Sequence, residues 1–118
     1  MTRDRRLAER RGRRAETIAA WWMRLHGWQI LARRKRLWMI EVDIIARRGD
    51  VLALVEVKQR ATIDAAIAAV SPDALRRLSR AAHQLATEAN ARGERLSARV
   101  DLVALVPRGL PRHIPQIG

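Results

Sequence analysis

The sequence contains no cysteine, which excludes disulfide bonds and thiolate metal sites. It also lacks phenylalanine and tyrosine, so beside four tryptophans the core must be built mainly from Leu, Ile, Val and Ala. The six glycines are scattered along the chain, which argues against a Gly-rich phosphate-binding loop. The three histidines, His26, His83 and His113, are too dispersed to indicate a zinc site.

Long apolar segments are also missing. The longest uninterrupted apolar runs reach only about one-third of a membrane span. The basic N-terminal residues are not followed by the apolar stretch of a secretion signal. We therefore expect a soluble cytoplasmic protein without membrane association.

The length and the apolar content indicate a folded chain. Its 118 residues are 48% hydrophobic, enough for a core of ordinary size. We expect a single domain over residues 1–118. Within it, residues 1–14 carry many arginines and form either a flexible arm or a frayed helix start, and the proline-rich tail over 107–118 forms a loop or a short edge strand.

The charge balance is strongly basic. Twenty-four Lys and Arg against 12 Asp and Glu give a net charge of +12, which predicts a polyanionic partner, and nucleic acid is the favoured one. Only two of the basic residues are lysines, so a solvated surface in an arginine-rich chain is the alternative reading. The basic residues are clustered along the chain, which favours contact with nucleic-acid phosphates over the alternative of a merely solvated surface.

Local patterns predict an α/β fold with the order helix, strand, strand, strand, helix, strand. The expected segments are a helix ending near 26–27, strands at 28–36, 38–46 and 51–58, a helix from 72 to about 90, and a strand at 100–106. Residues 61–70 indicate a short helix or an ordered loop. A hairpin followed by a crossover helix predicts a mixed sheet with helices packed against it.

Acidic residues interrupt the two apolar strands of the predicted hairpin. With a turn at residues 48–49, Glu41 is expected directly opposite Glu56, and Asp43 one diagonal step away on the same face. Lys58 leaves the second strand on the same side as Glu56. Three carboxylates in an apolar setting repel one another and lose hydration, and a divalent cation would make such a cluster tolerable.

The same residues suit phosphodiester hydrolysis. Carboxylate oxygens are ligands for Mg²⁺ or Mn²⁺, and a metal stabilises charge on the phosphate and lowers the pKa of the attacking water. We therefore predict Asp43, Glu56 and Glu41 as metal ligands. Lys58 is predicted to orient or deprotonate the water, or to neutralise the charge of the transition state. The alternative is structural: an ion pair between Glu56 and Lys58, with Asp43 capping a turn.

The spacing Asp43, then Glu56-Val57-Lys58, resembles the PD-(D/E)xK, or restriction-endonuclease-like, nuclease superfamily. Over residues 12–117 the chain is similar to the YraN-like family of small uncharacterised bacterial proteins, through the segments GRRAE, EVDIIAR, GD, VEVKxR, VSP, RVDLVAL and RHIP. The resemblance implies a restriction-endonuclease-like sandwich and kinship to archaeal Holliday-junction resolvases. It supplies no known activity, because the family is functionally obscure.

Residue by residue, the resemblance implies that Glu16 is the first-helix glutamate that completes the site. By itself Glu16 reads as a solvated helix residue paired with Arg13 or Arg14. Arg60 corresponds to the basic residue that follows the ExK strand. The chain departs from the family at Met39-Ile40, where glycines are usual, and at Ala74, where a basic residue is usual.

Basic residues outside this cluster are the expected phosphate contacts: Arg33, Arg34, Lys35, Arg36, Arg60, Arg76, Arg77 and Arg80. Together these features predict a Mg²⁺- or Mn²⁺-dependent nuclease acting on DNA, with structured or branched DNA as one substrate class. The alternative is a non-catalytic nucleic-acid-binding module that keeps the nuclease fold. Whether two copies form a homodimer stays open.

Overall fold

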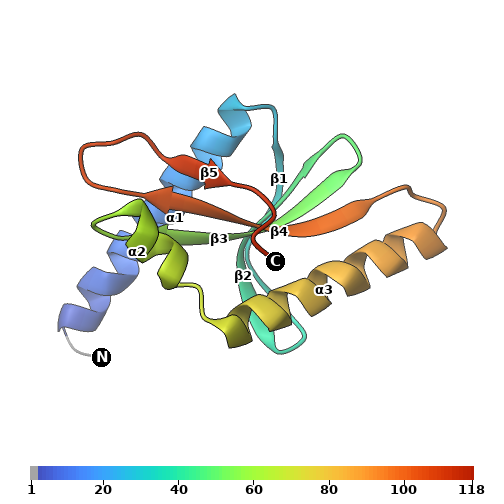
Figure 1. Ribbon diagram of the computed structural model, residues 1–118, viewed down its shortest axis with the longest axis horizontal. Helices are drawn as coiled ribbons and strands as arrows, with labels where there is room; N and C mark the ends of the chain where they lie inside the picture. Colours follow the sequence, from blue (N-terminus) through green and yellow to red (C-terminus); the bar gives the residue numbers. More distant parts are fainter. Residues whose placement is uncertain (1–2) are drawn as a thin grey trace.

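The computed structural model describes the backbone of residues 3–118 and the side chains of residues 12–118. Its elements in chain order are α1 (Arg3–Leu25), β1 (Gln29–Leu37), β2 (Ile40–Arg48), β3 (Val51–Gln59), α2 (Ile63–Ala68), α3 (Pro72–Ala91), β4 (Ser97–Leu105) and β5 (Arg112–Ile114). Helices α1 and α3 lie on opposite sides of the sheet (Figure 1). The predicted α/β sandwich with a mixed sheet is confirmed.

The sheet has the spatial order β1-β2-β3-β4-β5. Neighbouring strands are antiparallel except for β3 and β4, which are parallel. A parallel pair needs a crossover connection, and the chain supplies it through α2 and α3. Strand β1 is therefore one edge of the sheet, and the short strand β5 in the proline-rich tail is the other.

Helix α3 begins where its sequence predicts. The Ser71 hydroxyl accepts a hydrogen bond from the Ala74 N–H, and Pro72 occupies the first helical position. Its apolar face, which includes Leu78 and Ala82, packs on the sheet and leaves the arginines of the helix outside, as expected. Residues 61–70, left open between helix and loop, contain the short helix α2.

Helix α1 packs on the other face of the sheet through small residues. Ala15, Ala19 and Met23 are buried there, whereas Ile18 and Leu25 are exposed. Alanines allow the helix backbone to approach the sheet closely. Residues 3–14, predicted as an arm or a frayed start, belong to α1.

The β2–β3 hairpin turns one residue later than predicted. Arg48 is paired with Val51, so the turn residues are Gly49 and Asp50, and Gly49 takes a φ of +60°. A positive φ at the first turn position suits glycine in a two-residue hairpin. The shift changes which acidic residues face each other at the far end of the hairpin.

No helix in the described part of the chain, residues 3–118, is long and apolar enough to cross a membrane.

Candidate metal and nucleic-acid site

Asp43 lies where the regular pairing of β2 and β3 stops. The paired register ends at Ile44 and Val55, and extending it by one residue brings Asp43 opposite Glu56. Val42 packs on the α3 face and Ile44 on the α1 face, although residues two apart in a regular strand share a face. The alternation therefore breaks at Asp43, and its side chain turns toward the neighbouring strand.

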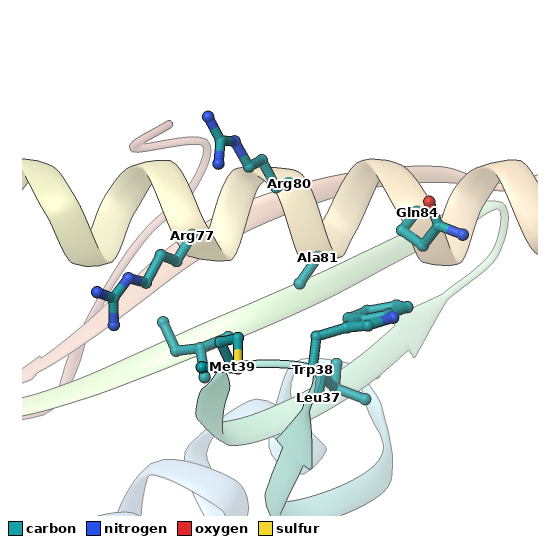
Figure 2. Close-up of a pocket in the computed structure, with 8 residues that line it drawn as sticks. Leu37, Trp38, Met39, Arg77, Arg80, Ala81 and Gln84 are labelled. Atoms are coloured by element: carbon teal, nitrogen blue, oxygen red, sulfur yellow. The ribbon is translucent and has the colours of Figure 1, made fainter.

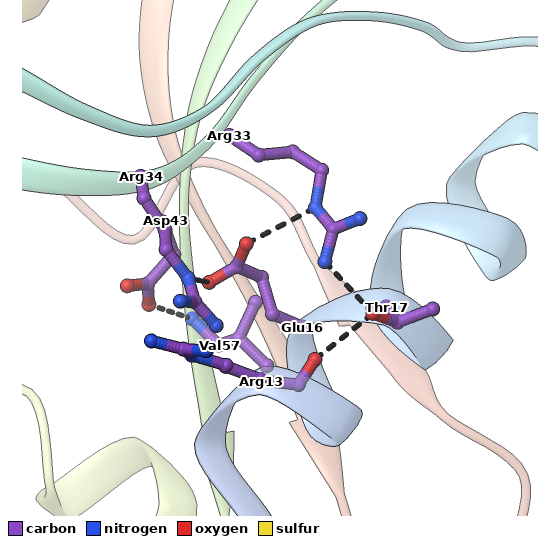
Figure 3. A network of polar contacts seen from close by, with 7 residues as sticks. All are labelled: Arg13, Glu16, Thr17, Arg33, Arg34, Asp43 and Val57. Atoms are coloured by element: carbon purple, nitrogen blue, oxygen red, sulfur yellow. Dashed lines mark hydrogen bonds and ion pairs between the residues drawn. The ribbon is translucent and has the colours of Figure 1, made fainter. Parts of the chain in front are cut away.

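The partner of Asp43 is a backbone group. Its Oδ2 accepts a hydrogen bond of 2.8 Å from the Val57 N–H, which would otherwise belong to a strand ladder (Figure 3). Burial raises the pKa of Asp43, and the Val57 N–H partly offsets that effect. The negative charges of Glu16 and Glu41 raise the pKa further, while Lys58 lowers it.

Glu56 is the more strongly perturbed carboxylate. It is only 9% exposed, and burial, followed by the charge of Asp43, raises its pKa to about 7. The Lys58 ammonium lies 3.6 Å from Glu56 Oε2 and opposes this effect only in part. A half-buried and a buried carboxylate that repel each other, with one amine beside them, form an electrostatic environment that favours additional positive charge.

The position of Glu41 corrects the prediction. The register does not set it directly opposite Glu56, since Asp43 occupies that place. Glu41 is exposed and lines a pocket of about 580 Å³ together with Asp43 and Glu16. Gly12, Arg13, Arg34 and Val57 complete the lining. Three of the four predicted acidic residues therefore border one pocket, with two arginines among them.

Glu16 is neither solvated nor paired with the arginines next to it on the helix. It is 5% exposed, and its two carboxylate oxygens accept hydrogen bonds from Arg33 Nε at 3.0 Å and Arg34 Nε at 2.9 Å (Figure 3). A pattern did exist for its burial, because Glu16 shares the helical face of Ala19, Ala20 and Met23 at spacings of three, four and seven.

The Glu16 contacts fix two arginines in the middle of strand β1. Arg34 adopts a positive φ of 50° and lies opposite Asp43, because its neighbours Arg33 and Lys35 are paired with Ile44 and Val42. Arg33 also donates to the Thr17 hydroxyl at 2.8 Å. A guanidinium has five N–H donors, so each arginine retains donors that could contact a phosphate.

The other predicted phosphate contacts are distributed over several surfaces. Lys35 and Arg36 are exposed on the edge strand β1, and Arg60 is exposed just after β3. Arg76, Arg77 and Arg80 are exposed on α3, across the sheet from α1, and the first two pair with Asp73. Of the predicted phosphate contacts, only Arg34 lines the acidic pocket.

A second buried polar cluster escaped the sequence analysis. Asp101 of β4 is fully buried and accepts hydrogen bonds from Arg99 Nε, His113 Nε2 and the Gln116 N–H at 3.0, 2.7 and 3.0 Å. Burial alone would raise the pKa of Asp101, but these donors together hold it below its usual value. The cluster attaches the tail and β5 to the sheet.

The donor chemistry of the acidic pocket fits a hard divalent cation. Asp43 lines the pocket, and Glu56, which lies opposite it on the next strand, adds a second carboxylate whose pKa the charge of Asp43 raises. Within the described side chains, no three acidic or histidine groups are gathered into a ready cluster for a metal ion. Mg²⁺ keeps several waters and is held by one or two protein carboxylates plus substrate phosphates, so this pair can hold it.

Comparison with known proteins gives the family. Residues 15–105 match the model of the uncharacterised protein family UPF0102. The chain belongs to this family. It is 45% identical over 113 residues to a UPF0102 protein of Sphingopyxis alaskensis, covering 96% of each chain.

Other UPF0102 proteins are similarly close. The identity is 47% over 111 residues for a protein of Brucella canis, covering 94% of this chain and 87% of the relative. It is 50% over 109 residues for one of Caulobacter vibrioides, covering 92% and 86%. The resemblance to the YraN-like family is therefore confirmed, and kinship with the nuclease superfamily stays a prediction.

Proposed function

We propose that the chain is a cytoplasmic, divalent-metal-dependent nuclease that hydrolyses phosphodiester bonds in DNA, with Mg²⁺ or Mn²⁺ as its cofactor. One observation carries this proposal: the half-buried Asp43 lies opposite the buried Glu56 where the pairing of β2 and β3 stops, with the Lys58 amine 3.6 Å from Glu56. Buried like charges cost stability, and a catalytic metal site is a physical reason to keep them.

Asp43 and Glu56 would hold the cation, with Glu41 at the exposed side of the pocket. The bound ion would supply charge neutralisation at the phosphate and a lowered pKa for a coordinated water. Lys58 lies on the same strand two residues after Glu56, so its ammonium lies beside the Glu56 carboxylate that would hold the cation. There it can orient the attacking water or stabilise the negative charge that develops on the phosphate.

The arginines around the pocket would position the substrate. Arg13 and Arg34 line the pocket that Asp43 borders, and Glu16 fixes the Arg34 side chain through its Nε. A guanidinium held at one nitrogen still presents other N–H groups to a phosphate, with less side-chain entropy to lose. Glu16 would thus act as a positioning residue rather than as a metal ligand.

The test is a cleavage assay on a panel of junction, flap, single-stranded and duplex DNA with Mg²⁺ or Mn²⁺. Asp43→Asn, Glu56→Gln and Lys58→Ala should each lower the rate by about 10²-fold or more. Glu94→Gln, which changes an exposed carboxylate, serves as the control and should leave the rate unchanged. Cleavage that persists in all three variants would contradict the assignment.

The same panel separates the alternative function. A non-catalytic module would bind these substrates in EDTA and in Mg²⁺ with similar affinity and cleave none of them. The carboxylates of Asp43 and Glu56 favour the enzyme, because negative groups beside a phosphate weaken binding unless a cation lies between them.

A further inference from the structure

A separate groove lies on the other side of the sheet, between the tip of the β1–β2 hairpin and α3. It measures about 400 Å³, within the usual range of small-ligand sites, and combines apolar and basic side chains. Its lining consists of Leu37, Trp38, Met39, Ile40, Arg77, Arg80, Ala81 and Gln84. Figure 2 shows the Trp38 ring below the helix, close to Gln84.

The hairpin tip has unusual turn residues. Leu37 pairs with Ile40, so the two-residue turn consists of Trp38 and Met39, where glycine, asparagine or aspartate is normal. Trp38 adopts a φ of +50°, a conformation that strains a bulky side chain. The two side chains are nevertheless 53% and 78% exposed. Strain combined with large exposed apolar groups indicates a binding role.

The positive charges of two arginines that line this groove favour a negatively charged ligand. Arg77 lines the groove at the end far from the Trp38 ring, and its guanidinium points away from that ring in Figure 2. Its contact with Asp73 at 3.1 Å is an exposed ion pair that a phosphate can replace. The aliphatic part of Arg80 lines the groove, while its guanidinium points away from the hairpin in this view. An aromatic ring and arginines that line one groove match the base and phosphates of a nucleic-acid strand.

The groove and the acidic pocket lie near the same end of the β1–β2 hairpin, on opposite faces of the sheet. Ile40 lines the groove, and the next residue, Glu41, lines the pocket. Along the edge strand β1, Arg34 at the pocket and Leu37 at the groove are separated by about 10 Å at ordinary strand rise. The exposed Lys35 and Arg36 lie between them, so a basic path connects the two sites around an open edge.

We propose that this groove binds an unpaired nucleotide of the nucleic-acid substrate, with Trp38 stacking on its base and Arg77 contacting its phosphate. The inference rests on the proposed nucleic-acid partner and specifies the substrate class: DNA that offers unpaired bases near the bond to be cleaved. A fully paired duplex keeps its bases stacked inside and cannot engage Trp38 in this way.

The test measures binding in EDTA, where no cleavage can occur. Labelled single-stranded DNA and a blunt duplex of the same length are titrated with wild type, Trp38→Ala and Trp38→Phe. Trp38→Ala should weaken binding of the single strand about 10-fold and binding of the duplex less than 2-fold, and Trp38→Phe should retain most of the affinity. Arg77→Ala should weaken binding of the single strand as well.

Matched controls come from exposed residues outside the groove. Trp21→Ala removes another exposed tryptophan, on α1, and Arg95→Ala removes an exposed arginine beyond the end of α3; both should leave the two affinities unchanged. Equal losses on single strand and duplex in Trp38→Ala, or no binding by wild type, would overturn the inference. Binding that follows the prediction in a protein without cleavage would instead refute only the nuclease function.

Discussion

Replacing Glu56 by glutamine should make the metal-free protein more stable at alkaline pH. The pKa of Glu56 is raised from its ordinary value of 4.5 to about 7 in the folded protein, chiefly by burial and then by the charge of Asp43. Between these two pH values the folded state binds more protons than the unfolded state, so stability falls as the pH rises. A carboxyl with a raised pKa thus destabilises the fold above pH 7.

The size of the effect follows from the same pKa. Each tenfold change in an ionisation constant is worth about 1.4 kcal/mol, so the charged Glu56 costs roughly 3 kcal/mol of unfolding free energy above pH 7. Glutamine has nearly the same shape and carries no charge. The unfolding free energy of Glu56→Gln should therefore exceed that of wild type by about 3 kcal/mol at pH 8. At pH 5 the two unfolding free energies should differ by no more than about 1 kcal/mol.

Urea unfolding in EDTA at pH 5 and pH 8 measures this difference. Comparing variant with wild type removes the contributions of histidines and other groups that both proteins share. Glu94→Gln, at an exposed position, should follow wild type at both pH values. The reasoning is refuted if Glu56→Gln is less stable than wild type at pH 8, since the contact with Lys58 at 3.6 Å would then outweigh the burial of the charge.

Three further predictions concern metal, salt and Glu16. Mg²⁺ at a hundredfold excess over its Kd should stabilise wild type by about 2.7 kcal/mol and thereby raise its melting temperature. Asp43→Asn should remove most of this rise, and equal rises in both proteins would contradict the site. Replacing Lys35 and Arg36 together by alanine should lower the log–log salt slope of DNA binding by about 1.8, and an unchanged slope would exclude them as phosphate contacts. Glu16→Ala should lower the free energy of unfolding in urea by about 1–2 kcal/mol, because it frees two arginines from their common partner; unchanged stability would show that these ion pairs contribute little.

Much of the fold could be predicted because local signals and tertiary packing agree. The Ser71-Pro72 helix start, the hairpin and the buried strand around Asp101 all carry patterns that depend on neighbours in sequence. The β2–β3 turn was misplaced by one residue because Arg48-Gly49 and Gly49-Asp50 both suit a tight turn. Only the packing of the flanking strands selects between them.

The site was predictable in composition but not in pairing. Asp43, Glu56 and Lys58 come together as expected, since strand spacing determines which of them share an end of the hairpin. The ion pairs of Glu16 with Arg33 and Arg34 span 17 and 18 residues, and no local pattern specifies such contacts. The groove at Trp38 was missed for the same reason, because α3 completes it from far along the chain.

The central claim is that Asp43 and Glu56 form a divalent-metal site, and the Val57 amide tests it most directly. This N–H donates to Asp43 Oδ2 at 2.8 Å, so its NMR signal reports on the carboxylate itself. Trace Mn²⁺ should broaden the Val57 signal in wild type, Mg²⁺ should compete the broadening away, and Asp43→Asn should abolish it. A Val57 signal that Mn²⁺ leaves sharp in wild type, or broadens equally in Asp43→Asn, would contradict the account.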